Sequence, residues 1–173
     1  LPSNRINSFL YDRQGNLWLA TDRGVAFARA AHFFEYVPLA DITKSSYGNS
    51  IGHVLVDHFG GTWLGGDNGI IHIEGKSIKW FRRRSGLRKN LIRNIYEDHD
   101  HDIWIATDAG IARYDRGKDT FVYYDINDGS GRNATWTYDI YEDSYGRLLI
   151  ATYMGGLYVV DKKVLLASQG KPA

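Results

Sequence analysis

The sequence predicts an all-β protein assembled from four copies of one four-stranded antiparallel unit, and three observations predict it. One pattern recurs four times in 173 residues: a β-rich run, Asp-x-x-Gly, apolar-Trp-apolar-small-Thr and a glycine turn. No run of about ten or more residues has helical periodicity. The composition, with 14% aromatic residues and 19 Gly against 3 Pro, suits short strands joined by tight turns.

Three columns of residues align the copies, the first two with spacings of 45, 41 and 45 residues. The aspartate column is Asp12, Asp57, Asp98 and Asp143. The tryptophan column is Trp18, Trp63 and Trp104, with Leu149 in the fourth copy. The turn glycines are Gly24, Gly69, Gly110 and Gly155. We interpret all three columns as structural. Each Asp is expected to accept backbone N–H groups across the turn between the first two strands, and each Gly to permit a hairpin with positive φ.

Within a copy, the residue pattern predicts four strands, which in the third copy lie at 92–97, 103–107, 111–114 and 120–124. Such a meander cannot bury both faces alone, so neighbouring copies must stack on it. Strand chemistry excludes helical solenoids, which leaves radial stacking as a β-propeller. The blades are expected at 1–48, 49–89, 90–134 and 135–173. Because the outer faces of the first and last blades would stay uncovered, we expect part of a larger ring, or a ring completed by a second copy.

Three positions depart from the repeat. Leu149 stands in the tryptophan column, His101 replaces the turn glycine, and Thr137 replaces the isoleucine of the other copies. We interpret them as adjustments of packing.

The run 103–115 (IWIATDAGIARYD), preceded by IYED at 95–98, resembles the two-component regulator propeller repeat, as do residues 17–24 and 150–158. The resemblance extends over residues 4–161. It implies the periplasmic sensor part of a membrane-bound regulator, commonly a hybrid histidine kinase, with carbohydrate ligands. Such sensors carry more repeats, so the chain would be a segment of one. It would itself catalyse nothing and would signal to a kinase or cyclase elsewhere in the protein.

Charge predicts where a ligand would bind. The net charge of +1 gives no general attraction to nucleic acid or membrane, yet residues 75–96 hold 8 of the 21 basic residues and no acidic one. These side chains either keep an exposed strand edge from pairing with another strand, or bind the carboxylate or sulfate groups of a small molecule or oligosaccharide. Linkers between blades border one mouth of a propeller channel, where aromatic side chains could also stack on sugar rings. The candidate ligand residues are Arg82, Arg83, Arg84, Arg88, Arg93, Tyr47, Asn49, Asn90, Trp136 and Tyr138.

Other chemistries have weaker support in the sequence. Cysteine is absent, and we expect no cofactor and no bound metal. Residues 98–102 (DHDHD) have metal-ligand chemistry, but alternation points successive side chains apart. His32, His53, His58 and His72 lack ligand spacing and are expected on blade surfaces or between blades. The alternatives to a sensor are a propeller enzyme of the streptogramin lyase type and a scaffold for oligomerisation.

Overall fold

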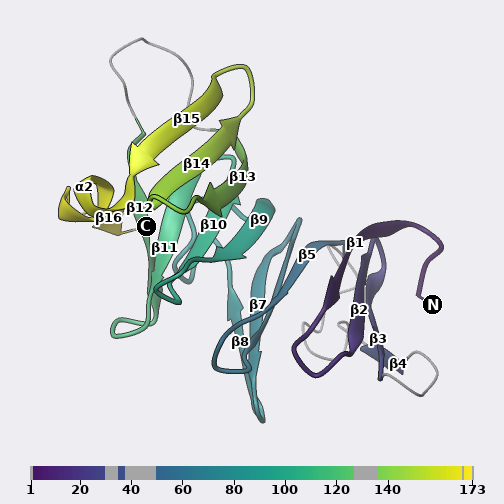
Figure 1. Cartoon of the computed structure of the whole chain (residues 1–173). Helices are drawn as coiled ribbons and strands as arrows, with labels where there is room; N and C mark the ends of the chain where they lie inside the picture. The colour runs from purple at the N-terminus through teal and green to yellow at the C-terminus, as the bar shows by residue number, and fades with distance from the viewer. Residues whose placement is uncertain (1, 30–34, 38–49, 127–135, 169, 173) are drawn as a thin grey trace.

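Four antiparallel sheets follow one another along the chain (Figure 1). The computed structural model describes residues 2–29, 35–37, 50–126, 136–168 and 170–172. The first sheet holds β1 (Ile6–Tyr11), β2 (Leu17–Thr21), β3 (Gly24–Ala28) and β4 (Glu35–Val37). The second holds β5 (Ile51–Val56), β6 (Thr62–Gly66), β7 (Gly69–Glu74) and β8 (Ser77–Phe81). The third contains β9 (Ile92–Glu97), β10 (Ile103–Thr107), β11 (Gly110–Asp115) and β12 (Thr120–Tyr124). The fourth contains β13 (Thr137–Glu142), β14 (Arg147–Thr152) and β15 (Gly156–Asp161). The predicted all-β propeller architecture is therefore confirmed.

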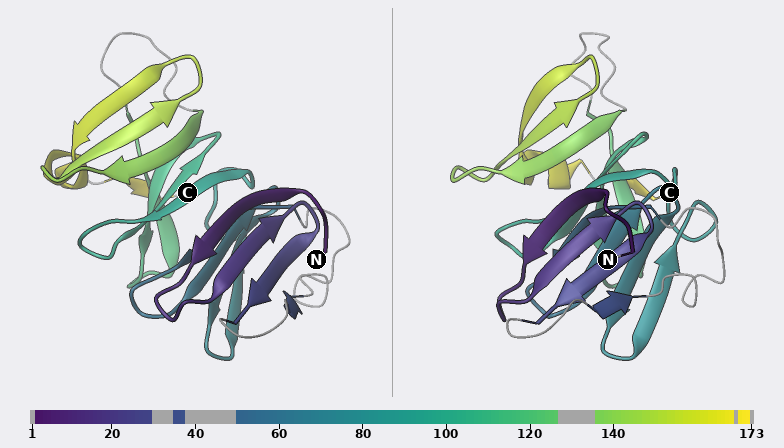
Figure 2. Two further views of the ribbon diagram at one scale, coloured as in Figure 1. Left: turned by 45° about the vertical axis from the view of Figure 1, so that its right-hand side comes forward. Right: turned by 90° about the vertical axis from the view of Figure 1, so that its right-hand side faces the viewer.

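The sheets form an arc, with the first and fourth at opposite ends (Figure 2). The first strand of each sheet, namely β1, β5, β9 and β13, contacts the first strand of the next sheet, so these four are the inner strands. We call the end that carries the β2–β3, β6–β7, β10–β11 and β14–β15 turns and the linkers between sheets the mouth. The opposite end, which carries the β1–β2 type and β3–β4 type turns, is the base.

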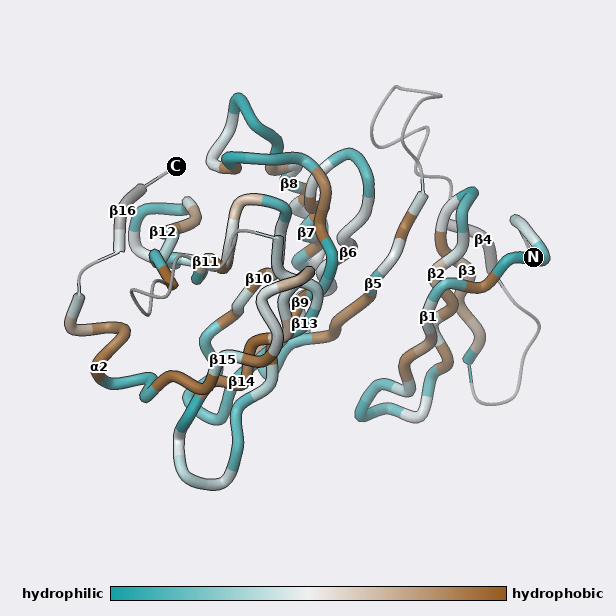
Figure 3. The backbone as a smooth tube through the Cα atoms, turned by 90° about the horizontal axis from the view of Figure 1, so that it is seen from above, coloured by the Kyte–Doolittle hydropathy of each residue, from teal (hydrophilic) through white to brown (hydrophobic). Residues whose placement is uncertain are grey.

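Three hydrophobic cores lie between successive sheets, which is why no sheet could fold alone. Trp63 from the second sheet packs with Ile105 and Phe121 of the third, and both Trp63 and Trp104 are completely buried. Trp104 packs in turn with Ile150 of the fourth sheet. Hydrophobic residues concentrate in the strands, while several turns are hydrophilic (Figure 3). Truncating a buried tryptophan of this kind to alanine costs about 3–5 kcal/mol.

Each turn aspartate connects the turn after the first strand of its sheet to the second strand through three hydrogen bonds. Asp57 Oδ1 accepts bonds from the backbone N–H groups of Phe59 and Gly61, at 3.0 and 2.8 Å, and its Oδ2 accepts one from Trp63 Nε1 at 2.8 Å. Asp12 and Asp98 make the same set of bonds with their own repeats. Each aspartate thus fixes the turn and orients the indole of its own sheet.

The departures from the repeat have structural reasons. Where Leu149 removes the indole, Arg147 Nε donates to Asp143 Oδ2 instead, at 2.8 Å. His101 adopts φ 65°, the conformation of the glycine that it replaces, and its ring stacks on His58 of the second sheet with centroids 3.8 Å apart. Thr137 is buried, accepts a bond from Thr107 N at 2.9 Å, and so ties the fourth sheet to the third.

The fourth sheet corrects two expectations. It has three strands rather than four, because Asp161 caps helix α2 (Lys162–Ala167) directly after β15 and turns the chain away from the sheet. Strand β16 (Lys171–Pro172) then pairs with β12, which gives the third sheet five strands. The repeat glycine is Gly156, with φ 83°, rather than Gly155, because the β14–β15 hairpin is one residue longer than its equivalents. No helix among the described residues has the length and apolar character needed to cross a bilayer.

The two ends of the arc leave apolar side chains uncovered. Phe9 and Tyr11 of β1 are 69% and 65% exposed. At the other end, Tyr141 of β13 and Leu157 and Val159 of β15 are exposed on the fourth sheet.

Candidate functional site

Backbone hydrogen bonds at the mouth connect the linkers to the hairpin turns. Gly69 N donates to Asn90 O at 2.8 Å, which joins the β6–β7 turn to the linker between β8 and β9. In the fourth sheet, Tyr153 N donates to Trp136 O at 2.8 Å in the same way. The mouth therefore collects side chains from segments that are far apart in the sequence.

A basic pocket lies in the linker between β8 and β9. Arg82, Arg83, Arg84 and Asn90 line a volume of about 270 Å³. Asn90 Oδ1 accepts a bond from Arg83 N at 2.7 Å, and the guanidinium of Arg82 lies 3.8 Å from the ring centre of Trp80. These contacts hold the linker and one of its arginines in place.

The three pocket arginines are exposed, and no described acidic residue forms an ion pair with any of them. Lys79, from the same basic stretch, differs because its Nζ lies 2.7 Å from Asp119 Oδ2. Unpaired guanidinium groups with fork geometry can bind carboxylate or sulfate oxygens in pairs. The pocket has the chemistry of an anion site.

A cluster of aromatic side chains lies at the mouth of the fourth sheet. Trp136 and Tyr138, both predicted ligand residues, have ring centres 5.4 and 6.1 Å from that of Tyr153. All three are between 42% and 45% exposed. Arg93 places its guanidinium 4.9 Å from the ring centre of Tyr138 and donates from Nε to Asp108 at 3.0 Å. Sequence reasoning missed Tyr153 because its segment was interpreted only as a hairpin turn.

The remaining predicted ligand residues are not in the pocket. The guanidinium of Arg88 lies 4.5 Å from the ring centre of Tyr123, and Arg88 N donates to the Tyr123 hydroxyl at 3.0 Å. Arg93 belongs to the aromatic cluster. Tyr47 and Asn49 lie outside the described residues.

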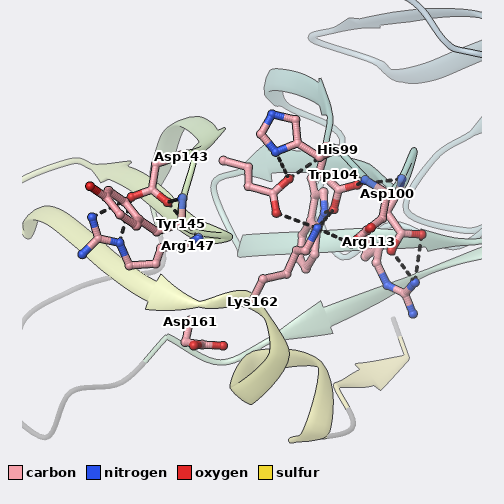
Figure 4. Close-up of polar contacts among 12 residues, drawn as sticks. His99, Asp100, Trp104, Arg113, Asp143, Tyr145, Arg147, Asp161 and Lys162 are labelled. Atoms are coloured by element: carbon pink, nitrogen blue, oxygen red, sulfur yellow. Dashed lines mark hydrogen bonds and ion pairs between the residues drawn. The ribbon is translucent and has the colours of Figure 1, made fainter.

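The base holds a buried ionic cluster around Lys162 (Figure 4). Its Nζ lies 3.1 Å from Asp98, 2.6 Å from Asp100 and 2.7 Å from Glu142, which come from the third and fourth sheets. Burial alone would lower the pKa of Lys162. Its hydrogen bonds to Asp100, Glu142 and Asp98 outweigh burial and hold the pKa above its ordinary value.

All five residues of the DHDHD segment have partners within the protein. Asp102 pairs with Arg113 Nη1 at 2.9 Å, and the two histidines contact acidic side chains, His99 on Glu142 and His101 on Glu97. Asp98 and Asp100 contact Lys162. Among the residues that the structure describes, no group of three or more His, Asp or Glu side chains is placed to hold a metal ion.

Comparison with known proteins identifies the repeat. The family model described as "Two component regulator propeller" matches residues 1–23 and 86–109. Two structures of the extracellular domain of the BT4673 system from B. thetaiotaomicron are 37% identical, with TM-scores of 0.71 and 0.72. They match 96% and 99% of this chain, which spans only 23% and 25% of theirs. No curated protein sequence matches.

More distant structures share the fold alone. The extracellular domain of the hybrid two component system BT3049 from B. thetaiotaomicron is 21% identical over 97% of this chain and 23% of its own, with a TM-score of 0.76. Virginiamycin B lyase from Staphylococcus aureus is 14% identical over 90% of this chain and 55% of its own, with a TM-score of 0.66. The repeat model and the match at 37% identity agree that the chain carries two-component regulator propeller repeats and corresponds to a segment of a larger extracellular propeller domain.

Proposed function

We propose that this chain is the part of an extracytoplasmic sensor that contacts the ligand, and that the ligand is a carbohydrate with anionic groups. The observation that carries the proposal is the pocket of Arg82, Arg83, Arg84 and Asn90 at the mouth. The signal would pass to a kinase elsewhere in the membrane-bound protein. In this role the chain itself catalyses no reaction.

The aromatic cluster of the fourth sheet supports a sugar ligand. Trp136, Tyr138 and Tyr153 offer exposed rings at the mouth of the fourth sheet, and the C–H faces of sugars stack on such rings. The arginines would make the site selective for anionic groups, since sulfate and carboxylate oxygens suit paired guanidinium donors. An acidic oligosaccharide has both kinds of group.

The test is binding of three probes: a neutral galacto-oligosaccharide, an oligogalacturonate and a chondroitin sulfate oligosaccharide. We expect the two acidic probes to raise the melting temperature of the chain, because a ligand that binds only the folded state stabilises it. The double variant Arg82→Ala with Arg84→Ala should weaken their binding at least about tenfold in calorimetric titration, since charged hydrogen bonds contribute about 1.5–3 kcal/mol each.

The matched control is Lys76→Ala with Lys163→Ala, which removes the same charge from exposed positions. Lys76 lies just before β8, at the opposite end of that strand from Arg82. If both double variants weaken binding equally, the effect is one of net charge and the pocket is not the site. If no probe binds the wild-type chain, the carbohydrate proposal is wrong.

The apolar ends of the arc support a further part of the proposal, namely that additional blades cover them in the full protein. The chain spans about a quarter of the extracellular domains that it matches, which leaves room for such blades there. The alternative cover is a second copy of the chain. Light scattering separates them: a dimer of the chain at micromolar concentration would favour the second copy.

A further inference from the structure

One polar residue occupies the same position on all four inner strands. The residues are Ser8, His53, Asn94 and Asp139, with spacings of 45, 41 and 45. In the sheet register they lie opposite Ala20, Gly65, Ala106 and Ala151. Each follows a β-bulge near the start of its strand, and each faces a small residue on the neighbouring strand. The position is therefore equivalent in space as well as in sequence, and its side chain differs in every copy.

Alternation along the strands shows which way these side chains face. His53 is two residues before Leu55, which packs into the core between the second and third sheets. Asn94 is two residues before Tyr96, which packs into the core between the third and fourth. Residues two apart on a strand share a face, so His53 and Asn94 lie on the faces that look toward the next sheet. The equivalent register places Ser8 and Asp139 on the same face of their strands, and for Asp139 that face lies at the end of the arc. Together they form a polar belt along the inner edge of the arc.

Two atoms of the belt have unmet hydrogen-bonding capacity. Ser8 Oγ and Asn94 Oδ1 are buried and have no hydrogen-bond partner among the residues that the structure describes. A buried polar atom without a partner costs about 1–3 kcal/mol, so such atoms call for an explanation. A ligand that supplies the missing bonds is one that fits the position.

His53 and Asp139 add further polar groups. Burial lowers the pKa of His53, and the negative charge of Asp139 partly opposes that shift, so the two groups interact across the inner edge. A neutral imidazole offers one donor and one acceptor. The belt is thus rich in acceptors and holds one carboxylate, which is the opposite of the basic pocket.

We propose that Ser8, His53, Asn94 and Asp139 form a second subsite, which binds hydroxyl groups of the ligand. Hydroxyls can donate to Asn94 Oδ1 and to the carboxylate while accepting from the imidazole or the serine. The inference rests on the proposed function, because it assigns the hydroxyl-bearing part of the same carbohydrate to the belt and the anionic part to the pocket. Asn94 follows Asn90 of the pocket by four residues, about 13 Å of extended chain, a span that an oligosaccharide can bridge.

The decisive variant is Asn94→Leu, tested with the same three probes. It replaces a half-buried amide, whose oxygen has no partner among the described residues, by an apolar side chain of similar size. We therefore expect the melting temperature to stay or rise while binding of the acidic probes falls about tenfold. A purely structural asparagine would give the reverse, with lower stability and unchanged binding. His53→Phe is the second variant, and His58→Phe, at the base of the same sheet, is its control.

Nuclear magnetic resonance of the histidine side chains gives an independent readout. Adding the oligogalacturonate or the chondroitin sulfate oligosaccharide should shift the ring signals of His53 and leave those of His58 unchanged. If the probes bind, and lose binding in the arginine double variant, but Asn94→Leu, His53→Phe and the His53 signals show no effect, the belt is wrong and the proposed function stands. If no probe binds the wild-type chain, the proposed function fails first, and the belt fails with it as a carbohydrate subsite.

Discussion

The base and the mouth of the blades use charge in opposite ways. At the base, Lys162 contacts three carboxylates from two sheets, and Arg147 pairs with Asp143. At the mouth, Arg82, Arg83 and Arg84 form no ion pair with any described residue, although they share a pocket. The charges of Lys162 and Arg147 at the base are satisfied within the protein, whereas Arg82, Arg83 and Arg84 at the mouth, unlike Arg93, have no ion-pair partner among the described residues.

The difference suggests a division within each repeat: residues at the base stabilise the fold, and residues at the mouth are the proposed ligand contacts. The Asp-x-x-Gly turn and its indole partner lie toward the base, and the copies agree there except for His101 in the third and Leu149 in the fourth. The linkers and the belt lie toward the mouth, and the copies differ there. Four predictions test this division, from the largest expected effect to the smallest.

Removing the charge of Lys162 should damage the base most. Lys162→Met leaves Asp98 and Glu142 buried without their cation, and breaking a buried pair in this way costs about 3–5 kcal/mol. Urea unfolding measures the loss. The neighbouring Lys163→Met, at an exposed position, should change stability little, and equal losses in both variants would contradict the role of the cluster.

The turn aspartates should rank by burial. Asp57→Ala leaves the Trp63 indole N–H and two backbone N–H groups without their acceptor, at a cost of about 3 kcal/mol. Asp143→Ala, in the exposed turn that lacks the indole, should lower the unfolding free energy less. Chemical denaturation of both variants checks the order, and a larger loss for Asp143→Ala would reverse the comparison.

Acid should weaken the base through its carboxylates. The hydrogen bond from Lys162 lowers the pKa of Asp100, and the one from Lys79 lowers the pKa of Asp119, both below 3.8. A carboxyl with a lowered folded pKa adds stability above its unfolded pKa and loses it as the pH falls through the folded pKa. Calorimetric melting from about pH 6 to about pH 2 should show this fall, with a shallower slope in Asp100→Asn.

The mouth arginines should matter least for stability. Arg82→Ala with Arg84→Ala removes exposed charges that have no ion-pair partner among the described residues, so unfolding free energy should stay within about 0.5 kcal/mol of the wild type. Thermal and urea unfolding measure this. A loss as large as that of Lys162→Met would place the arginines in the architecture rather than in recognition.

Local patterns predicted most of the fold. Three of the four strands expected in the third copy have the predicted bounds, and β11 extends one residue further at each end. This worked because the repeat fixes the register four times over, so an error in one copy is visible in the others. The fourth sheet was harder to predict because six residues of α2 are too few to show helical periodicity, and Gly155 and Gly156 compete for one turn position.

Side-chain contacts between copies were beyond local patterns. Lys162 is 64 residues from Asp98 in the chain, and no local pattern links them. The basic stretch did point to Arg82, Arg83 and Arg84, but only the folded linker separates them from Arg88, which lies on Tyr123. The polar belt did leave a signal, since its four members share the spacing of the aspartate column. His53 was overlooked because it was compared with other histidines rather than with Ser8, Asn94 and Asp139.

Because Leu149 replaces the column tryptophan, Trp136 can serve as a fluorescent label for the fourth sheet. Because the fourth sheet lacks the buried column indole, Trp136 is its only tryptophan, and it is 45% exposed at the mouth. Trp63 and Trp104 are shielded completely from water. An aqueous quencher such as iodide will therefore reach the emission of Trp136 and leave that of the two buried indoles intact. Trp18 and Trp80 are half-buried and add a background to the quenchable fluorescence. A fall in the quenchable fraction on top of that background then reports, without any attached dye, that the mouth of the fourth sheet is covered.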